Sequence, residues 1–161
     1  MGIVDTLTDC RARLSRLREV YEPPFDLGPL VIHDGAWVEG RLAANVPAYA
    51  GGAVWRLPLD STYWLPSADD MAKIIGWDWI DHKEYVASRF DCEDFALAFK
   101  SRVNSLFLLN NVGVVVDWSA GHGYNVILLA DGSVWWFEPQ VDTLVDIGTS
   151  IYTLTSGCIL V

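Results

Sequence analysis

Residues 90–96 read Phe-Asp-Cys-Glu-Asp-Phe-Ala, a stretch that sets one cysteine between acidic residues where a helix is predicted to begin. Asp91 is a favourable N-cap residue, and Asp94 stands three positions later, where its carboxylate can reach back to the cap. Residues 96–100 favour helix. Cys92 therefore falls in the first turn of a predicted helix.

The helical repeat of about 100° per residue places four apolar residues on the same side of this helix as Cys92. They are Phe95, Ala96, Phe99 and Val103. The thiol is thus predicted to face the interior of the fold. Two interpretations of Cys92 remain open. In one, it is a nucleophile, whose thiol pKa the helix N-terminus lowers while the adjacent acids oppose this lowering. In the other, it is a small buried core thiol.

The chain after this helix has the pattern of an antiparallel sheet. Three runs rich in β-branched and aromatic residues cover 112–118, 122–130 and 134–140, and Asp131-Gly132 is a strong hairpin signal between the last two. Residues 151–161 add one or two strands. The prediction here is an α+β fold in which the helix that carries the cysteine packs on a mainly antiparallel β-sheet.

The first half of the chain is predicted to be helical and rich in loops. Residues 3–21 have a helical pattern, residues 30–59 read as short strands and loops, and Ser67 precedes a capped helix that Gly76 could end. We expect a single domain over residues 1–161. Its N-terminal half covers about residues 1–85, and its core covers about residues 86–161.

Composition excludes several classes of partner. The 161 residues carry a formal net charge of −10, which argues against nucleic acid and anionic membranes and favours a cation or a basic ligand. Eight tryptophans suggest aromatic packing surfaces or a groove. The three cysteines lack the spacing of a zinc site or a disulfide framework. With no signal peptide or membrane-spanning segment recognised, the cytoplasm is the favoured location.

Strand alternation brings a second set of polar residues to one end of the predicted hairpin. His122 lies near the start of one strand, and Glu138 and Gln140 lie near the end of its neighbour. With Cys92 on the packed helix, the order is nucleophile, base, then an orienting acid or amide. Asn125 falls on the face opposite His122, which favours a structural role.

Three blocks of this sequence, residues 90–96, 121–125 and 138–140, resemble the C-terminal protease domain of mushroom galactose-binding agglutinins (chimerolectins), a branch of the papain-like cysteine peptidases. The resemblance spans roughly residues 85–142. It implies a papain-like or transglutaminase-like fold, cleavage of peptide bonds through a thioester intermediate, and activation by calcium. Carried over to this chain, Cys92 is the nucleophile, His122 the general base and then acid, and Glu138 the group that orients the histidine.

Calcium would require oxygen ligands, and Asp91, Glu93 and Asp94 are the candidate ligands. The alternative is that these acids cap and solvate the start of the helix. Residues 61–91 contain no Gln or Asn that could serve as the side-chain donor of an oxyanion hole. Other candidates for the oxyanion hole or for a groove are Gln140, Asn125, Tyr85 and Trp79.

We expect an enzyme, a cysteine peptidase or a related amide-hydrolysing or acyl-transfer hydrolase, whose partner is a peptide or protein substrate. No further cofactor is required by this chemistry, and the oligomeric state is open, a dimer included. The alternative is a non-catalytic papain-like binding module that holds a basic peptide or protein partner in an acidic groove rich in tryptophan. A third reading is a structural protein in which Cys92 is only a core residue.

Overall fold

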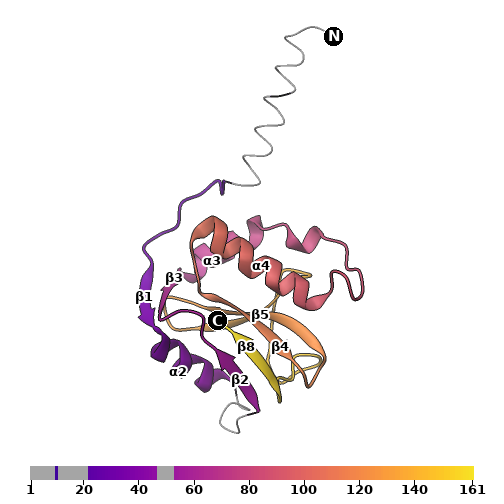
Figure 1. Cartoon of the computed structure of the whole chain (residues 1–161). Coiled ribbons are helices and arrows are strands. Elements are labelled where there is room, and N and C mark those ends of the chain that lie inside the picture. The colour runs from indigo at the N-terminus through magenta and orange to yellow at the C-terminus, as the bar shows by residue number, and fades with distance from the viewer. Residues whose placement is uncertain (1–9, 11–21, 47–52) are drawn as a thin grey trace, which may run out of the picture.

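The computed structural model describes residue 10 and residues 22–46 and 53–161 (Figure 1). The helix expected over residues 3–21 falls, apart from Cys10, outside this part of the chain. The elements, in chain order, are β1 (Val31–Asp34), α2 (Gly35–Asn45), β2 (Val54–Leu57), β3 (Thr62–Leu65), α3 (Ala68–Trp77), the 3-10 helix η2 (Ile80–His82), α4 (Cys92–Phe107), β4 (Val112–Asp117), β5 (His122–Leu128), β6 (Val134–Glu138), β7 (Thr143–Val145) and β8 (Gly157–Leu160). None of the helices described combines the length and the apolar character needed to cross a bilayer.

A six-stranded sheet in the order β2-β8-β4-β5-β6-β7 forms the centre of the fold. All of its pairs are antiparallel except β2–β8, which is parallel. Gly132 has φ +85°, a conformation that glycine adopts without strain, and it sits in the predicted turn between β5 and β6. The three strands predicted over residues 112–140 are confirmed, and each begins where expected and ends one or two residues earlier.

The two faces of this sheet carry separate apolar cores. On β5, Val126 and Leu128 belong to the core that contacts α2, whereas Ile127 belongs to the core beneath α3 and α4. This alternation is what a strand buried on both faces produces. Figure 1 shows the resulting layers, with α3 and α4 on one side of the sheet and α2 on the other. A two-stranded ribbon of β1 and β3 lies beside them.

Helix α4 begins as its sequence predicts. The carboxylate of Asp91 accepts a hydrogen bond from the backbone of the N3 residue, and the Asp94 carboxylate accepts one from Asp91 N, which together form a capping box. The four apolar residues predicted to share a face with Cys92 are buried, whereas Cys92 itself is only partly buried; the four are Phe95, Ala96, Phe99 and Val103. The cysteine therefore begins a helix that is fixed both by its cap and by its packing on the sheet.

Helix α2 was not expected, because residues 30–59 were interpreted as short strands and loops. Asp34, predicted to lie at a turn, caps this helix by accepting a hydrogen bond from Trp37 N at 2.8 Å. Burial of Val38 and Leu42 against the sheet outweighs the low helix propensity of the two glycines in the segment. The predicted stop at Gly76 was also wrong by one residue, since α3 extends to Trp77.

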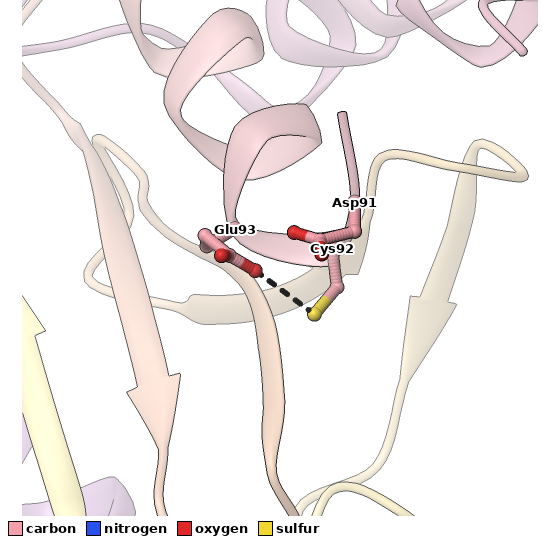
Figure 2. Close-up of side chains that lie close together, drawn as sticks. All are labelled: Asp91, Cys92 and Glu93. Atoms are coloured by element: carbon pink, nitrogen blue, oxygen red, sulfur yellow. Dashed lines mark hydrogen bonds between the residues drawn. The ribbon is translucent and has the colours of Figure 1, made fainter. Parts of the chain in front are cut away.

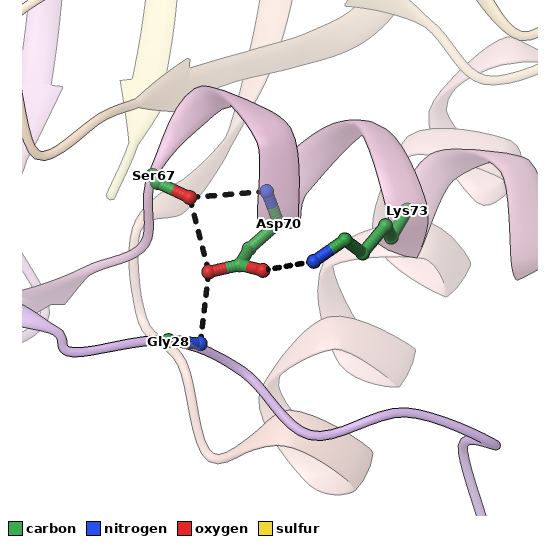
Figure 3. A network of polar contacts seen from close by, with 4 residues as sticks. All are labelled: Gly28, Ser67, Asp70 and Lys73. Carbon is green, nitrogen blue, oxygen red and sulfur yellow. Dashed lines mark hydrogen bonds and ion pairs between the residues drawn. The ribbon is translucent and has the colours of Figure 1, made fainter.

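Asp70 joins the start of α3 to the segment before β1 (Figure 3). Its carboxylate accepts hydrogen bonds from Gly28 N at 2.9 Å, from Ser67 Oγ at 3.0 Å and from Lys73 Nζ at 2.8 Å. The hydrogen bond from Lys73 is the main cause that lowers the pKa of Asp70, and burial opposes it. This ionised, buried carboxylate therefore holds the segment before β1 against the start of α3.

Candidate functional site

The candidate site lies where the N-terminus of α4 meets one end of the sheet. Cys92 is the first residue of α4, His122 the first of β5, and Glu138 the last of β6. His122 Nε2 lies 2.6 Å from Glu138 Oε2, and their side chains are only 11% and 5% exposed. The hairpin thus brings the imidazole and the carboxylate together at one end, as strand alternation predicted.

The Glu138 carboxylate is held by two further donors. Gln140 N donates to Oε1 at 3.1 Å, and the Tyr152 hydroxyl donates to Oε2 at 3.1 Å. Burial, and next the negative charge of Glu138, raise the pKa of Tyr152 to about 12. The Tyr152 phenol therefore stays protonated and remains a donor throughout the neutral range. Sequence reasoning missed Tyr152, because it lies outside the hairpin and no local pattern links it to Glu138.

The Cys92 thiol lies next to both a carboxylate and a backbone N–H group. Its Sγ donates to Glu93 Oε2 at 3.3 Å, and Figure 2 shows the thiol and that carboxylate turned toward each other. Burial is the largest cause that raises the pKa of Cys92; the Gly123 N–H lowers it and Glu93 raises it. Burial and the adjacent acid thus outweigh the Gly123 and Glu93 N–H groups, so the pKa of Cys92 is raised, whereas its position at the helix N-terminus had suggested a lowering.

Glycine at position 123 lets β5 approach the start of α4. A Cβ atom built there would lie 2.8 Å from both N and Cα of Glu93, closer than packed atoms come. The strand can therefore bring the Gly123 N–H to the Cys92 sulfur only because this residue has no side chain. Gly123 thus sets the distance between the thiol and the strand that carries His122.

Two adjoining pockets open around this site, and both are lined by Cys92, Gly121 and His122. The first extends over Glu93, Val116 and Trp118. The second is also lined by Tyr85, Glu138, Gln140, Val141, Ile151 and Tyr152. Trp118 is 55% exposed and Tyr85 is 52% exposed, so each pocket has an exposed aromatic residue in its lining. The pockets combine aromatic faces with a few convergent polar groups, which is typical of a ligand site.

Asp117 fixes the loop that presents Trp118. This buried carboxylate accepts hydrogen bonds from Ser119 N at 3.0 Å, Ala120 N at 3.2 Å and Leu154 N at 2.7 Å, and from the Ser119 hydroxyl. It therefore ties the loop between β4 and β5 to the segment that follows Tyr152. Neither Asp117 nor Trp118 was identified from sequence, where each reads as an ordinary strand end.

The other predicted residues separate into two groups. Tyr85 and Gln140 line the second pocket. Asn125 is buried on the opposite face, where its Nδ2 donates to Ala96 O and Gly113 O at 2.9 Å each and anchors α4 to the sheet. Trp79 lies outside both pockets, with Lys83 and Arg102 over its ring. Asn125 and Trp79 are therefore not brought to the site.

The acidic residues at the start of α4 were the candidate calcium ligands. Ligand atoms of Asp91, Cys92 and Glu93 lie within 4.8 Å of one another (Figure 2). Asp94 is not part of this group, and its carboxylate accepts the capping bond from Asp91 N. Calcium takes about 6–8 oxygen ligands, and a thiol is a poor ligand for it. These donors alone fall short of a calcium site, and calcium binding stays a prediction that a calcium titration of wild type and Glu93→Gln tests.

Similar folds occur among solved lectin structures. One is titled "PSL1a-E64 complex" (TM-score 0.64, 23% identity, 81% of this chain and 51% of that chain). Another is the Polyporus squamosus lectin bound to the human-type influenza-binding epitope Neu5Aca2-6Galb1-4GlcNAc (TM-score 0.58, 22% identity, 81% and 49%). The chain thus spans about half the length of these neighbours, and the likeness concerns the fold. No curated protein matches the sequence.

These matches correct the assignments made from the three sequence blocks. The matching structures and the matching family are lectins, which overturns the papain-like or transglutaminase-like fold, the peptidase or acyl-transfer enzyme, and the peptide-binding module. The predicted peptide or protein partner is likewise not supported by the neighbours, whose own titles name a glycan epitope and E64. The physical reason is that a thiol, an imidazole and a carboxylate in the right order define neither a fold nor a ligand.

The family whose sequence profile matches residues 30–153 is described as "Ricin-type beta-trefoil lectin C-terminal domain". Because this match covers well over half of the residues, the chain belongs to the family of C-terminal domains of ricin-type β-trefoil lectins.

Proposed function

We propose that this chain is a domain of a carbohydrate-binding protein and that the pocket beside His122 and Trp118 binds a saccharide. The observation that carries the proposal is an exposed indole in the same pocket as the His122 imidazole, which pairs with the Glu138 carboxylate of the adjoining pocket. The apolar face of a sugar ring packs on an aromatic ring, while its hydroxyls exchange hydrogen bonds with imidazole and carboxylate groups. Membership of a lectin family supports the same ligand class.

Charge favours a neutral saccharide. The Polyporus squamosus lectin was solved with an epitope that ends in the acidic sugar Neu5Ac. In this chain the net charge is −10, and the carboxylate of Glu93 lines the pocket itself. An acidic sugar would be repelled there, whereas the neutral portion of that epitope, Galb1-4GlcNAc, would not.

Calorimetric titration with the two forms of that epitope tests the proposal. Wild type is expected to bind the neutral disaccharide and to bind the sialylated trisaccharide more weakly. Trp118→Ala is expected to abolish most of the binding, whereas Trp64→Ala, which removes a partly exposed tryptophan outside both pockets, retains it. No binding to wild type, or equal loss in both variants, would contradict a saccharide site at this pocket.

The thiol in this pocket supports a second property. PSL1a was solved as a complex with E64, an epoxide that reacts with thiols. We propose that Cys92 is the residue of this chain that E64 modifies, because it lines the same pockets as the His122–Glu138 pair. A carbon–sulfur bond forms, the epoxide carbon–oxygen bond breaks, and the released oxygen takes up a proton.

Peptide mapping after E64 treatment separates a selective thiol from a merely accessible one. Modification is expected at Cys92 before Cys10, although Cys10 is exposed, and is expected to slow in His122→Ala. Equal, slow modification of both cysteines in both proteins would show that His122 does not act on Cys92.

All three cysteines are free, which supports a reducing compartment such as the cytoplasm, and cell fractionation tests that location.

A further inference from the structure

Tyr152 and His122 share one oxygen of Glu138, although the two rings come from separate segments of the chain. Glu138 Oε2 accepts a hydrogen bond from the Tyr152 hydroxyl at 3.1 Å and lies 2.6 Å from His122 Nε2. Its other oxygen, Oε1, accepts a hydrogen bond from Gln140 N at 3.1 Å. Glu138 is only 4% exposed, so its carboxylate cannot turn without losing one of these contacts where little water can replace it. The orientation of this carboxylate is therefore fixed through both of its oxygens.

The contact with Glu138 also decides which nitrogen of His122 is left for the pocket. A carboxylate accepts hydrogen bonds and does not donate them, so the contact with Glu138 requires a hydrogen on Nε2. In the neutral imidazole, Nδ1 then carries no hydrogen and can accept one. Cys92 and His122 line both pockets together, which makes the Cys92 thiol the candidate proton donor to Nδ1.

The Tyr152 ring packs against the imidazole as well. It contacts the His122 ring edge to face, with centroids 5.5 Å apart, and it contacts the buried Tyr124 ring in the same manner at 5.2 Å. An imidazole that rotated about its side-chain bonds would have to displace these packed rings. Tyr152 therefore restrains both members of the His122–Glu138 pair, the carboxylate through a hydrogen bond and the imidazole through its ring.

Asp117 holds the segment after Tyr152 against the loop that leads to His122. Asp117 is paired with His122 across β4 and β5, and its carboxylate accepts a hydrogen bond from Leu154 N at 2.7 Å. The Ser119 hydroxyl gives its one hydrogen to Asp117, so it is the acceptor in its other contacts. These contacts, at 2.8 Å and 3.0 Å, are with two residues that follow Tyr152, namely Thr153 (hydroxyl) and Thr155 (backbone N–H). The loop before His122 thus fixes the place of Tyr152 beside it.

We propose that Tyr152 is a positioning residue for the reaction of the Cys92 thiol, and that it acts through Glu138 by holding His122 with Nδ1 free to take the thiol proton. This proposal rests on the proposed modification of Cys92 by E64. The thiol proton passes to Nδ1, the sulfur bonds to an epoxide carbon, the carbon–oxygen bond breaks, and the imidazolium returns the proton to the epoxide oxygen. Tyr152 exchanges no proton in this step, because its part is to hold the base that does.

The rate at which E64 modifies Cys92, followed by intact mass over a range of E64 concentrations, tests this role. Tyr152→Phe keeps the ring and loses the hydroxyl that holds Glu138. The maximal rate of modification is expected to fall about tenfold, the effect of losing one hydrogen bond to a charged group. The half-saturating concentration of E64 is expected to stay that of wild type, because the pocket keeps its shape. A change confined to that concentration would show a role in holding the reagent and overturns the proposal.

Tyr124→Phe is the matched control. It removes a hydroxyl from the ring next to Tyr152, and within the described residues that hydroxyl is buried without a hydrogen-bond partner. Its rate of modification at Cys92 is therefore expected to equal that of wild type. Equal slowing in Tyr124→Phe and Tyr152→Phe would show a general effect of altered packing and overturns the specific role of the Tyr152 hydroxyl.

A double substitution shows whether Tyr152 acts through His122. In the His122→Ala background, Tyr152→Phe is expected to cause no further slowing, because the group that Tyr152 positions is gone. A merely structural role, such as support of the pocket wall, would slow the reaction by the same factor in both backgrounds. That result, or a Tyr152→Phe rate equal to wild type, overturns the positioning role and leaves the action of His122 on Cys92 intact.

The wild-type protein provides a test that needs no altered pocket. A long-range nitrogen–proton spectrum of the His122 ring in mildly alkaline buffer, assigned with His122→Ala, is expected to show a hydrogen on Nε2 and none on Nδ1. A hydrogen on Nδ1 overturns the proposal. If E64 modifies Cys92 no faster than Cys10, or equally fast in His122→Ala, the proposed reaction itself fails, so the two failures are distinguishable.

Discussion

Glu138 Oε2 lies 2.6 Å from His122 Nε2 and 3.1 Å from the Tyr152 hydroxyl, so one carboxylate oxygen organises two rings from two separate segments. His122 and Tyr152 also contact each other edge to face, with centroids 5.5 Å apart. A change at Glu138 must therefore be detectable at Tyr152.

Replacing Glu138 by Gln is expected to lower the pKa of Tyr152 from about 12, because the negative charge that helps to raise it is removed. Burial remains, so the pKa is expected to stay above the ordinary tyrosine value. Ultraviolet titration of the ionised phenol measures it, with Tyr152→Phe identifying the signal. An unchanged titration curve in Glu138→Gln would mean that the contact is not formed in solution.

Replacing Glu93 by Gln is expected to speed alkylation of Cys92 at neutral pH. Glu93 raises the pKa of the thiol through its hydrogen bond and its charge, so its removal lowers that pKa and increases the thiolate fraction. The pH dependence of iodoacetamide labelling measures the shift. Glu84→Gln, which removes an exposed acid, is the matched control, and an equal change in both variants would show a general charge effect.

Gly123→Ala is expected to destabilise the fold by about 1–3 kcal/mol, because the added Cβ meets the Glu93 backbone at 2.8 Å and α4 must shift. The same substitution at Gly40 is the control. That glycine lies within α2 with nothing within 4 Å of its Cβ position, so alanine there is expected to stabilise by about 0.5–1 kcal/mol. Urea unfolding measures both, and changes of the same sign would contradict the close approach.

Asp70→Asn is expected to destabilise the protein at neutral pH by about 1–3 kcal/mol, because three donors lose an ionised acceptor. The folded pKa of Asp70 is lowered, so its contribution to stability is full above the unfolded pKa of 3.8 and is lost as the pH falls through the folded value. Thermal unfolding of both proteins from neutral to acidic pH should therefore converge. A constant difference down to the lowest pH would show that the charge of Asp70 does not matter.

The features predictable from sequence were those with local signals. The capping residues around Cys92 and the turn at Asp131-Gly132 lie within a few positions of the elements that they define, and both predictions are confirmed. The same strand alternation placed His122 next to Glu138. These inferences needed only the geometry of one helix and one hairpin.

The features that sequence could not give depend on distant contacts. Helix α2 is held by burial of Val38 and Leu42 against the sheet, which outweighs the strand-like local composition. Tyr152 reaches Glu138 from a distant segment, which Asp117 ties to the loop after β4. The ligand class was also beyond reach, because the order of a thiol, an imidazole and a carboxylate does not specify what occupies the pocket.

The most direct test of a saccharide site is a nitrogen–proton spectrum recorded during titration with Galb1-4GlcNAc. The predicted result is a set of saturable shifts at the Trp118 indole and at the amides of Gly121 and Gly123, with the Trp64 indole unchanged. A spectrum that does not change at saturating sugar, or one that changes only at residues outside the pocket, would contradict the assignment of this pocket as the ligand site.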